Sequence, residues 1–123
     1  MPSPNLSITH LVGNQNNPHV TANEAIDKLD KALCDSENIP ISTADVTLTS
    51  AQALENMHIK TSGTLTANRN LIVPTNKKLY LVEHGSGGGF NITVKTAAGT
   101  GVTLTPGQVK LVYCDGTNVI GLS

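Results

Sequence analysis

Four histidines are the first residues to test for chemistry, because an imidazole can bind a metal or act as a general base. They stand at positions 10, 19, 58 and 84, and none has another histidine, a cysteine or a carboxylate at the spacing of a metal-binding motif. The sequence therefore predicts no metal site within one chain. One histidine per chain could still form a shared site on a symmetry axis, which no sequence pattern would reveal.

Two cysteines are the next candidates, because a thiolate is both a nucleophile and a metal ligand. Cys34 and Cys114 lie far apart in the sequence, and spacing pairs neither with a particular histidine as a base. Two interpretations stay open. In the first, both cysteines are buried thiols. In the second, they form a possible disulfide, within or between chains, in an assembly that lies outside the cell.

The glycine run at 85–89 is the remaining chemical motif. It lacks the Gly-Lys-Ser/Thr ending and the following helix of a phosphate-binding loop, and we interpret it as a flexible hairpin loop. The sequence also has no Gly-x-Ser-x-Gly motif for a nucleophilic serine. We therefore predict no catalytic residue and no cofactor, so the protein is expected not to be an enzyme.

Composition narrows the classes of partner. Lysine and arginine number 8 against 9 acidic residues, and Phe90, Tyr80 and Tyr113 are the only aromatic residues other than histidine. Nucleic-acid binding needs a basic surface and stacking platforms, and sugar-binding faces usually stack an aromatic ring. The N-terminus lacks the pattern of a secretory signal, and no apolar run approaches the ~20 residues that span a bilayer. We expect a protein made in the cytoplasm, with neither nucleic acid nor membrane as a partner.

The clearest predicted element is a helix over residues 20–33. Thr21 and Glu24 have the spacing of a capping box, which places the start of the helix at Thr21. An apolar stripe follows at spacings of four, three and four residues: Ala22, Ile26, Leu29 and Leu33. A helix this short is marginal in water, so the stripe must be buried. It packs either on the chain's own sheet or against neighbouring subunits around an axis.

The segments on either side of this helix divide the chain into two parts. Residues 1–19 contain three prolines and many amide side chains, which predicts an extended arm anchored by Leu6, Ile8, Leu11 and Val12. Ile39 and Pro40 end the helix and form the link to the rest. We therefore expect residues 1–40 to be an arm plus helix for assembly and anchoring, and residues 41–123 to be a β domain.

The β domain is predicted from a change to a two-residue period after residue 44. The expected strands cover residues 45–49, 57–62, 64–73, 77–84, 90–96, 102–104, 108–114 and 118–122. Turn residues separate them, and Asp115-Gly116 is a strong hairpin signal. Seven or eight short strands predict a mainly β protein whose domain is an antiparallel sandwich or jelly roll.

Two stretches resemble proteins of tailed-phage particles. The segment HVTANEAIDKLDKAL resembles the N-terminal helix of a family of small phage and prophage proteins with an N-E-A-x-x-x-L-D core, which here is residues 23–30. The C-terminal half, which includes LIVPTNKKLYLVEHG and VKLVYCDGTNVIGL, is similar to β modules of phage tail-fibre and head-surface proteins. The resemblance covers most of the chain and implies a virion structural protein. Because one β domain stands where that family commonly has a larger receptor-binding region, we do not expect a full-length fibre.

Three functional hypotheses follow. The first is a head decoration, or cement, protein exposed on the particle surface: a homotrimer that binds other virion proteins such as the major capsid protein. Its expected assembly contacts are Ile8, Leu11, Ala22, Ile26, Leu29 and Leu33. The second is a short tail-fibre, collar or baseplate component. The third is a host-glycan-binding module that uses loops such as 85–89 and 115–118. The threefold axis is itself implied by the resemblance and by the helical stripe, which does not dictate oligomer number.

Overall fold

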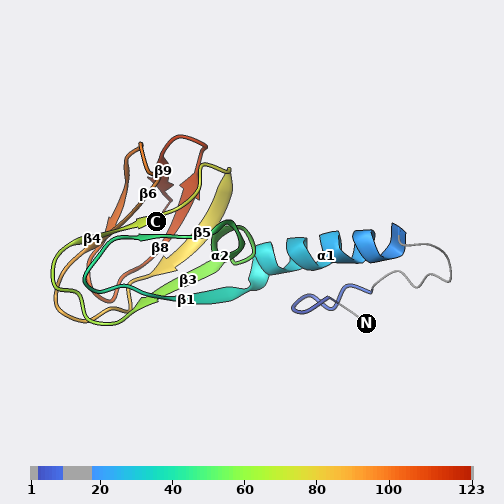
Figure 1. Cartoon of the computed structure of the whole chain (residues 1–123), viewed down its shortest axis with the longest axis horizontal. Helices are drawn as coiled ribbons and strands as arrows, with labels where there is room; N and C mark the ends of the chain where they lie inside the picture. The colour runs from blue at the N-terminus through green and yellow to red at the C-terminus, as the bar shows by residue number, and fades with distance from the viewer. Residues whose placement is uncertain (1–2, 10–17, 123) are drawn as a thin grey trace.

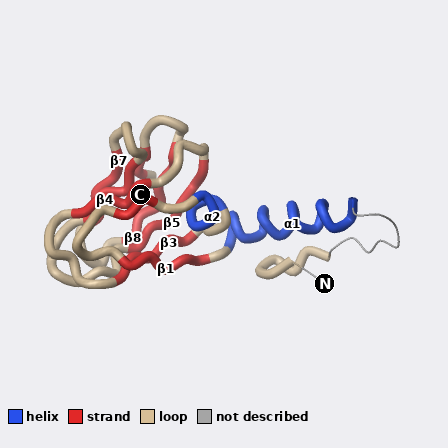
Figure 2. The backbone as a smooth tube through the Cα atoms, in the orientation of Figure 1, coloured by secondary structure: helices blue, strands red, loops and turns tan. Residues whose placement is uncertain are grey.

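The molecule consists of a β domain and a helix that projects from it. The computed structural model describes residues 3–9 and 18–122. Helix α1 (Pro18–Cys34) extends from the β domain along the longest axis of the chain, and the arm, residues 3–9, lies beside it (Figure 1). A second, one-turn helix, α2 (Ser50–Leu54), lies where α1 meets the strands (Figure 2).

In the described part of the chain, nine strands form two sheets. The five-stranded sheet has the order β1 (Ser36–Pro40), β3 (His58–Ser62), β5 (Lys78–Glu83), β8 (Val109–Cys114) and β9 (Val119–Gly121). The four-stranded sheet has the order β2 (Val46–Thr47), β4 (Arg69–Ile72), β6 (Ile92–Lys95) and β7 (Gly101–Leu104). The prediction of a mainly β fold is confirmed.

The pairing within the sheets corrects the prediction of an antiparallel fold. From β1 to β6 the chain alternates between the two sheets, so that one strand in each sheet makes one circuit of the domain. Each strand pairs in parallel with the strand that follows one circuit later: β1 with β3 and β3 with β5 in one sheet, β2 with β4 and β4 with β6 in the other. Among the described strands, the antiparallel pairs are β5–β8, β6–β7 and β8–β9. The error arose because turn residues between short strands were interpreted as hairpins, whereas most of these turns carry the chain across to the other sheet.

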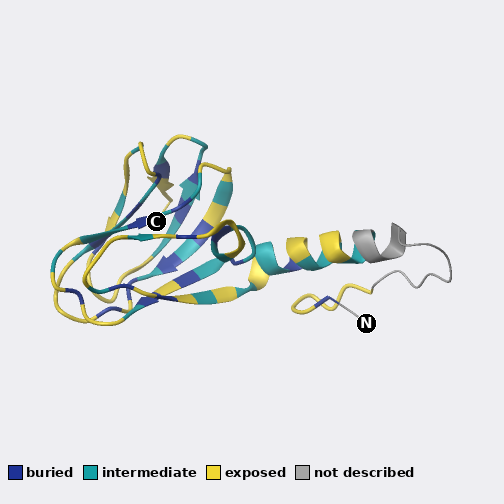
Figure 3. Cartoon of the chain, in the orientation of Figure 1, coloured by how far each residue is buried: buried dark blue, intermediate teal, exposed yellow. Residues whose placement is uncertain are grey.

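The hydrophobic core lies between the sheets and is complete without α1. Among the residues whose side chains the structure describes, the sixteen buried apolar ones fall between Ile39 and Val119, and the most enclosed large side chains include Tyr80, Ile59 and Leu71. Strand β5 shows the alternation that builds the core, because Tyr80 and Val82 are buried while Leu79 and Leu81 are not. Figure 3 shows buried bands on the strands and mostly exposed or intermediate bands along α1. The apolar stripe of α1 therefore does not pack on the chain's own sheets.

The glycine run is a corner between sheets and not the hairpin loop that we predicted. It joins β5 in one sheet to β6 in the other, and Gly87 forms a parallel bridge with Thr64 of the preceding circuit. Gly88 adopts φ 102°, and a Cβ there would lie 2.3 Å from the carbonyl oxygen of Leu65. Glycine is needed at Gly88 because successive corners stack too closely for a side chain.

The element boundaries differ from the predictions in the strands, where the expected strand at 64–73 is β4 over Arg69–Ile72, and at both helices. Helix α1 begins at Pro18, so Thr21 lies inside the helix and not at its N-cap, in keeping with the preference of proline for the first turn. The helix ends at Cys34, and the expected link is strand β1, so the five-stranded sheet begins before residue 41. The only capping box among the described helices is at Thr49 and Gln52 of α2, a helix that we had not predicted.

The hairpin signal at Asp115-Gly116 is confirmed. It connects β8 to β9, and the Asp115 carboxylate accepts hydrogen bonds from the backbone N–H groups of Thr117 and Asn118, at 2.9 and 2.8 Å. These bonds lower the pKa of Asp115 below its usual value of 3.8. The turn therefore fixes the last strand at the edge of the five-stranded sheet.

Candidate assembly interface

The stripe on α1 remains largely uncovered. Leu29 is 65% exposed and Leu33 is 63% exposed, while Ala22 and Ile26 nearer the start of the helix are half-buried. Ile8 of the arm is 42% exposed, and Leu11 lies outside the described residues. Two leucines this exposed on one face of a projecting helix form an apolar surface of the kind that marks protein–protein contacts. The structure thus places the predicted contact residues Ile8, Leu29 and Leu33 on the surface, where another chain can reach them.

The arm is fastened to α1 through a single carboxylate. The side chain of Asp30 is fully buried and accepts three hydrogen bonds from the arm: from the Ser3 hydroxyl at 2.5 Å, from the Leu6 N–H at 2.6 Å and from the Asn5 N–H at 2.8 Å. The side-chain amide of Asn5 also donates a hydrogen bond to the Asp35 carboxylate, at 2.9 Å. This contact was not predicted, because Asp30 lies outside the apolar stripe and helical periodicity gives no signal for a polar partner.

The electrostatics of Asp30 favour the attached arm. Burial by itself would raise the pKa of the Asp30 carboxyl, but the hydrogen bonds from Ser3, Leu6 and Asn5 outweigh burial and hold the pKa below its usual value of 3.8. Hydrogen bonds to an ionised carboxylate are stronger than those between neutral groups. At neutral pH, Asp30 is therefore charged and holds the arm in place.

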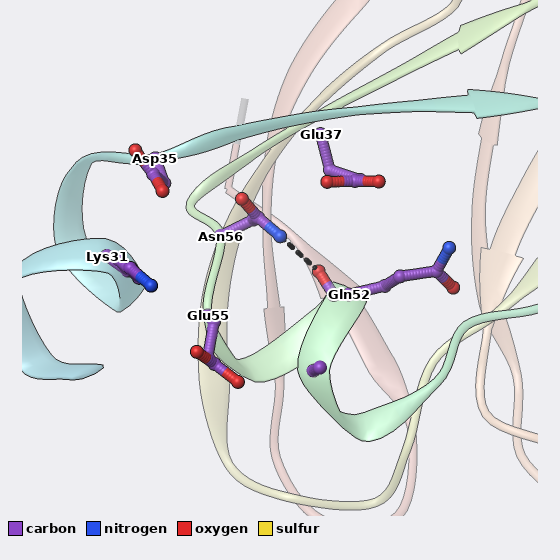
Figure 4. A pocket seen from close by; sticks show the side chains of 7 residues that line it. Lys31, Asp35, Glu37, Gln52, Glu55 and Asn56 are labelled. Carbon is purple, nitrogen blue, oxygen red and sulfur yellow. Dashed lines mark hydrogen bonds between the residues drawn. The ribbon is translucent and has the colours of Figure 1, made fainter. Parts of the chain in front are cut away.

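Two hollows separate α1 from α2. The first, which we call the apolar groove, is bounded by side chains from both helices: Lys28, Leu29, Ala32, Ser50, Ala51, Leu54 and Glu55. The second is polar and is drawn in Figure 4, with side chains of Lys31, Asp35, Glu37, Gln52, Glu55 and Asn56 around it. There, the Asn56 side chain donates to the Gln52 carbonyl oxygen, at 2.9 Å. The apolar groove is thus continuous with the stripe, since Leu29 belongs to both.

The two cysteines have different environments. Both are free in this structure; Cys34 is exposed at the end of α1, and Cys114 is buried in β8 with its thiol 3.5 Å from the Pro74 carbonyl oxygen. The buried-thiol interpretation therefore fits Cys114 alone, and the two do not form a disulfide with each other within the chain. Cys34 remains accessible to a second chain.

A polar row across the five-stranded sheet was not predicted. The Ser36 hydroxyl lies 2.8 Å from His58 Nδ1, and His58 Nε2 lies 3.1 Å from a Glu83 carboxylate oxygen, on strands β1, β3 and β5. Lys60 Nζ is 3.7 Å from the other oxygen. Serine hydrolases use the same three kinds of group, but there the hydroxyl faces Nε2 and the carboxylate faces Nδ1. Here the row links three parallel strands on a face where His58 and Glu83 are 27% and 32% exposed.

The sequence feature that could have revealed this row is the nearly constant spacing between its three members. Ser36 and His58 are 22 residues apart, and His58 and Glu83 are 25 apart, which corresponds to one circuit of the chain through both sheets.

Of the other histidines, His84 is buried and its Nε2 lies 2.8 Å from the Phe90 carbonyl oxygen, while the side chains of residues 10 and 19 lie outside the described part. Within residues 3–9 and 18–122, no group of histidine, cysteine and acidic side chains is arranged to hold a metal ion.

Comparison with protein-family models, with curated proteins and with solved structures found no match to this chain. In the described part of the chain, neither helix is long and apolar enough to cross a membrane. The surface of α1, the arm and the apolar groove together form the candidate assembly interface.

Proposed function

We propose that this protein is a non-enzymatic structural component of a tailed-phage particle, and that it is a homotrimeric decoration, or cement, protein of the head surface. The observation that carries the proposal is the contrast between a β domain with its own closed core and a projecting helix with Leu29 and Leu33 largely exposed. Such a helix gains stability by packing against other copies or other proteins. The resemblance of the helix and of the β modules to phage proteins supports the particle as the setting.

In this proposal the two parts of the molecule have separate tasks. The arm and α1 bind neighbouring copies and other virion proteins such as the major capsid protein, while the β domain, a sandwich of two facing sheets, points outward. Many copies that bury apolar surface across the joints between capsid subunits stabilise the particle by mass action, since they bind the assembled state and not the separated one. The protein is made in the host cytoplasm and acts on the surface of the virion.

A double substitution on α1 tests the assembly role. Ile26→Asp with Leu29→Asp places two charges on the stripe, and we expect a monomeric protein that no longer binds particles, with an unchanged strand signal in circular dichroism. Val109→Asp is the matched control, because Val109 is 51% exposed but lies on β8, away from the stripe. An oligomer and particle binding that survive the double substitution would refute the assignment of α1.

A short tail-fibre or collar component is the second candidate, and one observation favours it. Helix α1 lies along the longest axis of the chain with the β domain at one end (Figure 1), which suits a stalk and a tip. Counting copies on purified particles separates the candidates, since a head decoration protein is present in hundreds of copies and a tail component in tens or fewer.

A further inference from the structure

The residues of α1 can be placed around its axis from the helical repeat of 3.6 residues per turn. With Ile26 and Leu33 at heptad position a, and Ala22 and Leu29 at position d, Asp30 occupies position e and Ala32 occupies position g. Positions e and g lie on opposite sides of the a/d seam. Asp30 and Ala32 therefore mark the two flanks of the exposed stripe.

The flank at Asp30 carries the arm. Three hydrogen bonds hold the arm there, and the arm's own apolar side chains are not used up by this contact: Leu6 is 48% exposed and Ile8 is 42% exposed. The arm, residues 3–9, contains no charged side chain. Along this flank the chain thus presents an uncharged, apolar projection fixed by a buried carboxylate.

The flank at Ala32 carries the apolar groove. Small or apolar side chains form its floor and walls, with Leu29 and Ala32 on α1 facing Ala51 and Leu54 on α2. Ala51 is exposed, and Ala32 and Leu54 are half-buried. The charged residues that bound the groove, Lys28 and Glu55, have opposite signs and leave no net charge to repel a neutral segment. An uncharged apolar projection suits such a groove.

Neighbouring parallel helices bring position e of one chain next to position g of the next. We therefore propose, building on the homo-oligomer of the proposed function, that the apolar groove is the docking site for the arm of a second copy, with Leu6 and Ile8 of one chain against Ala32, Ala51 and Leu54 of its neighbour. Each chain then supplies an arm on one flank and a groove on the other. Repeated around the axis of the parallel helices of a closed oligomer, the contact places each arm in the groove of the next chain.

Site-directed crosslinking tests the docking. Two chains, each with a single exposed cysteine, are made in a Cys34→Ser background that keeps the buried Cys114, one with Ile8→Cys and one with Ala51→Cys. They are mixed, assembled and mildly oxidised. We expect a disulfide-linked product of twice the chain mass that contains one chain of each kind. The control mixture replaces Ala51→Cys with Val109→Cys, which is exposed on β8, and we expect at least tenfold less product.

Native mass, measured before oxidation, distinguishes the two levels of the proposal. An oligomer that gives the mixed product supports the docking. An oligomer with no more product than the control overturns the docking and leaves the assembly through α1 standing, whereas a monomer overturns both.

A second experiment removes the apolar side chains of the arm. Leu6→Ser with Ile8→Ser should raise the dissociation constant of the oligomer about tenfold or more, because two apolar side chains are no longer transferred from water into the groove. An unchanged constant would also overturn the docking.

Discussion

The β domain and the helix–arm region use their apolar residues in opposite ways. In the β domain, large side chains such as Tyr80 and Leu71 are fully buried between two sheets, so the domain is stabilised by its own chain. In the helix–arm region, Leu29 and Leu33 are exposed, and the internal contact between arm and helix is polar, through Asp30. The β domain is therefore a folding unit, and we propose that the helix–arm region is a binding unit. Substitutions in the two regions should therefore affect different measurements.

The largest expected effect on folding comes from the core. Leu71→Ala removes a side chain that is fully buried in β4, and we expect the free energy of unfolding to fall by about 2–5 kcal/mol. Leu79→Ala is the matched control, because Leu79 is 38% exposed in β5 and should cost less than about 1 kcal/mol. Urea denaturation followed by circular dichroism measures both. Equal losses would contradict the placement of the core between the sheets.

The stacked corner gives a second, smaller effect that sharpens the account of the β domain. Gly88→Ala should lower the free energy of unfolding by about 1–3 kcal/mol, because it combines a positive φ with a Cβ that meets the Leu65 carbonyl oxygen. Gly89→Ala also has a positive φ, 77°, but a Cβ there has no neighbour within 4 Å. The excess loss of Gly88→Ala over Gly89→Ala therefore measures the close approach of successive circuits. No excess would mean that these corners do not stack.

The arm should respond to Asp30 without any change in the β domain. Because the folded-state pKa of Asp30 is lowered, its ionised form stabilises the attached arm above pH 3.8, and this stabilisation is lost as the pH falls through the lower folded value. Asp30→Asn should release the arm at neutral pH. Hydrogen exchange at the Asn5 and Leu6 amides should become at least about tenfold faster, with unchanged urea unfolding of the β domain. Exchange that stays slow in the variant would show that another group holds the arm.

The smallest effect concerns Lys78 at the edge of the core. Burial lowers the pKa of Lys78 to about 8, while its ammonium donates to the Asn56 carbonyl oxygen and lies 4.3 Å from the Tyr80 ring centre. The unfolded chain, with a lysine pKa near 10.5, binds more protons between these values, so this group makes stability rise from pH 8 to pH 10. Lys78→Met should flatten that rise in urea unfolding. A rise of the same size in the variant would assign it to another group.

Tyr80 limits the range over which this test applies. Burial, with a further contribution from Cys114, raises the pKa of Tyr80 to about 12. A raised phenol pKa favours the folded state at lower pH, and that stabilisation is lost as the pH rises from about 10 to 12. The Lys78 comparison is therefore made below pH 10.

Local patterns in the sequence predicted the elements but not how distant elements pair. Helix α1 was found because its apolar stripe has a helical period, and the β8–β9 hairpin was found because Asp115-Gly116 specifies a tight turn. Strand β1 was missed because its sequence, SENIP, contains a single buried residue, Ile39. The parallel pairing was missed because it depends on partners a whole circuit apart, for which the sequence has no local signal.

The candidate interface was predicted in part. The stripe residues Leu29 and Leu33 follow from periodicity, but periodicity does not say whether a stripe faces the chain's own core or another chain. The arm–Asp30 contact and the groove between α1 and α2 depend on tertiary placement, and α2 itself was missed because its five residues are too few to show a helical period. The sequence thus indicated which residues to test, and the fold supplied the reason to expect a partner.

The most direct test of the central claim, that α1 is an interface between copies, is the native mass of the purified wild-type chain by light scattering, with and without reductant. We predict three times the chain mass of 12.8 kDa under both conditions. A dimer present only in the absence of reductant would assign the association to a disulfide between the exposed Cys34 thiols of two chains and not to the stripe. A monomer under both conditions would contradict the account.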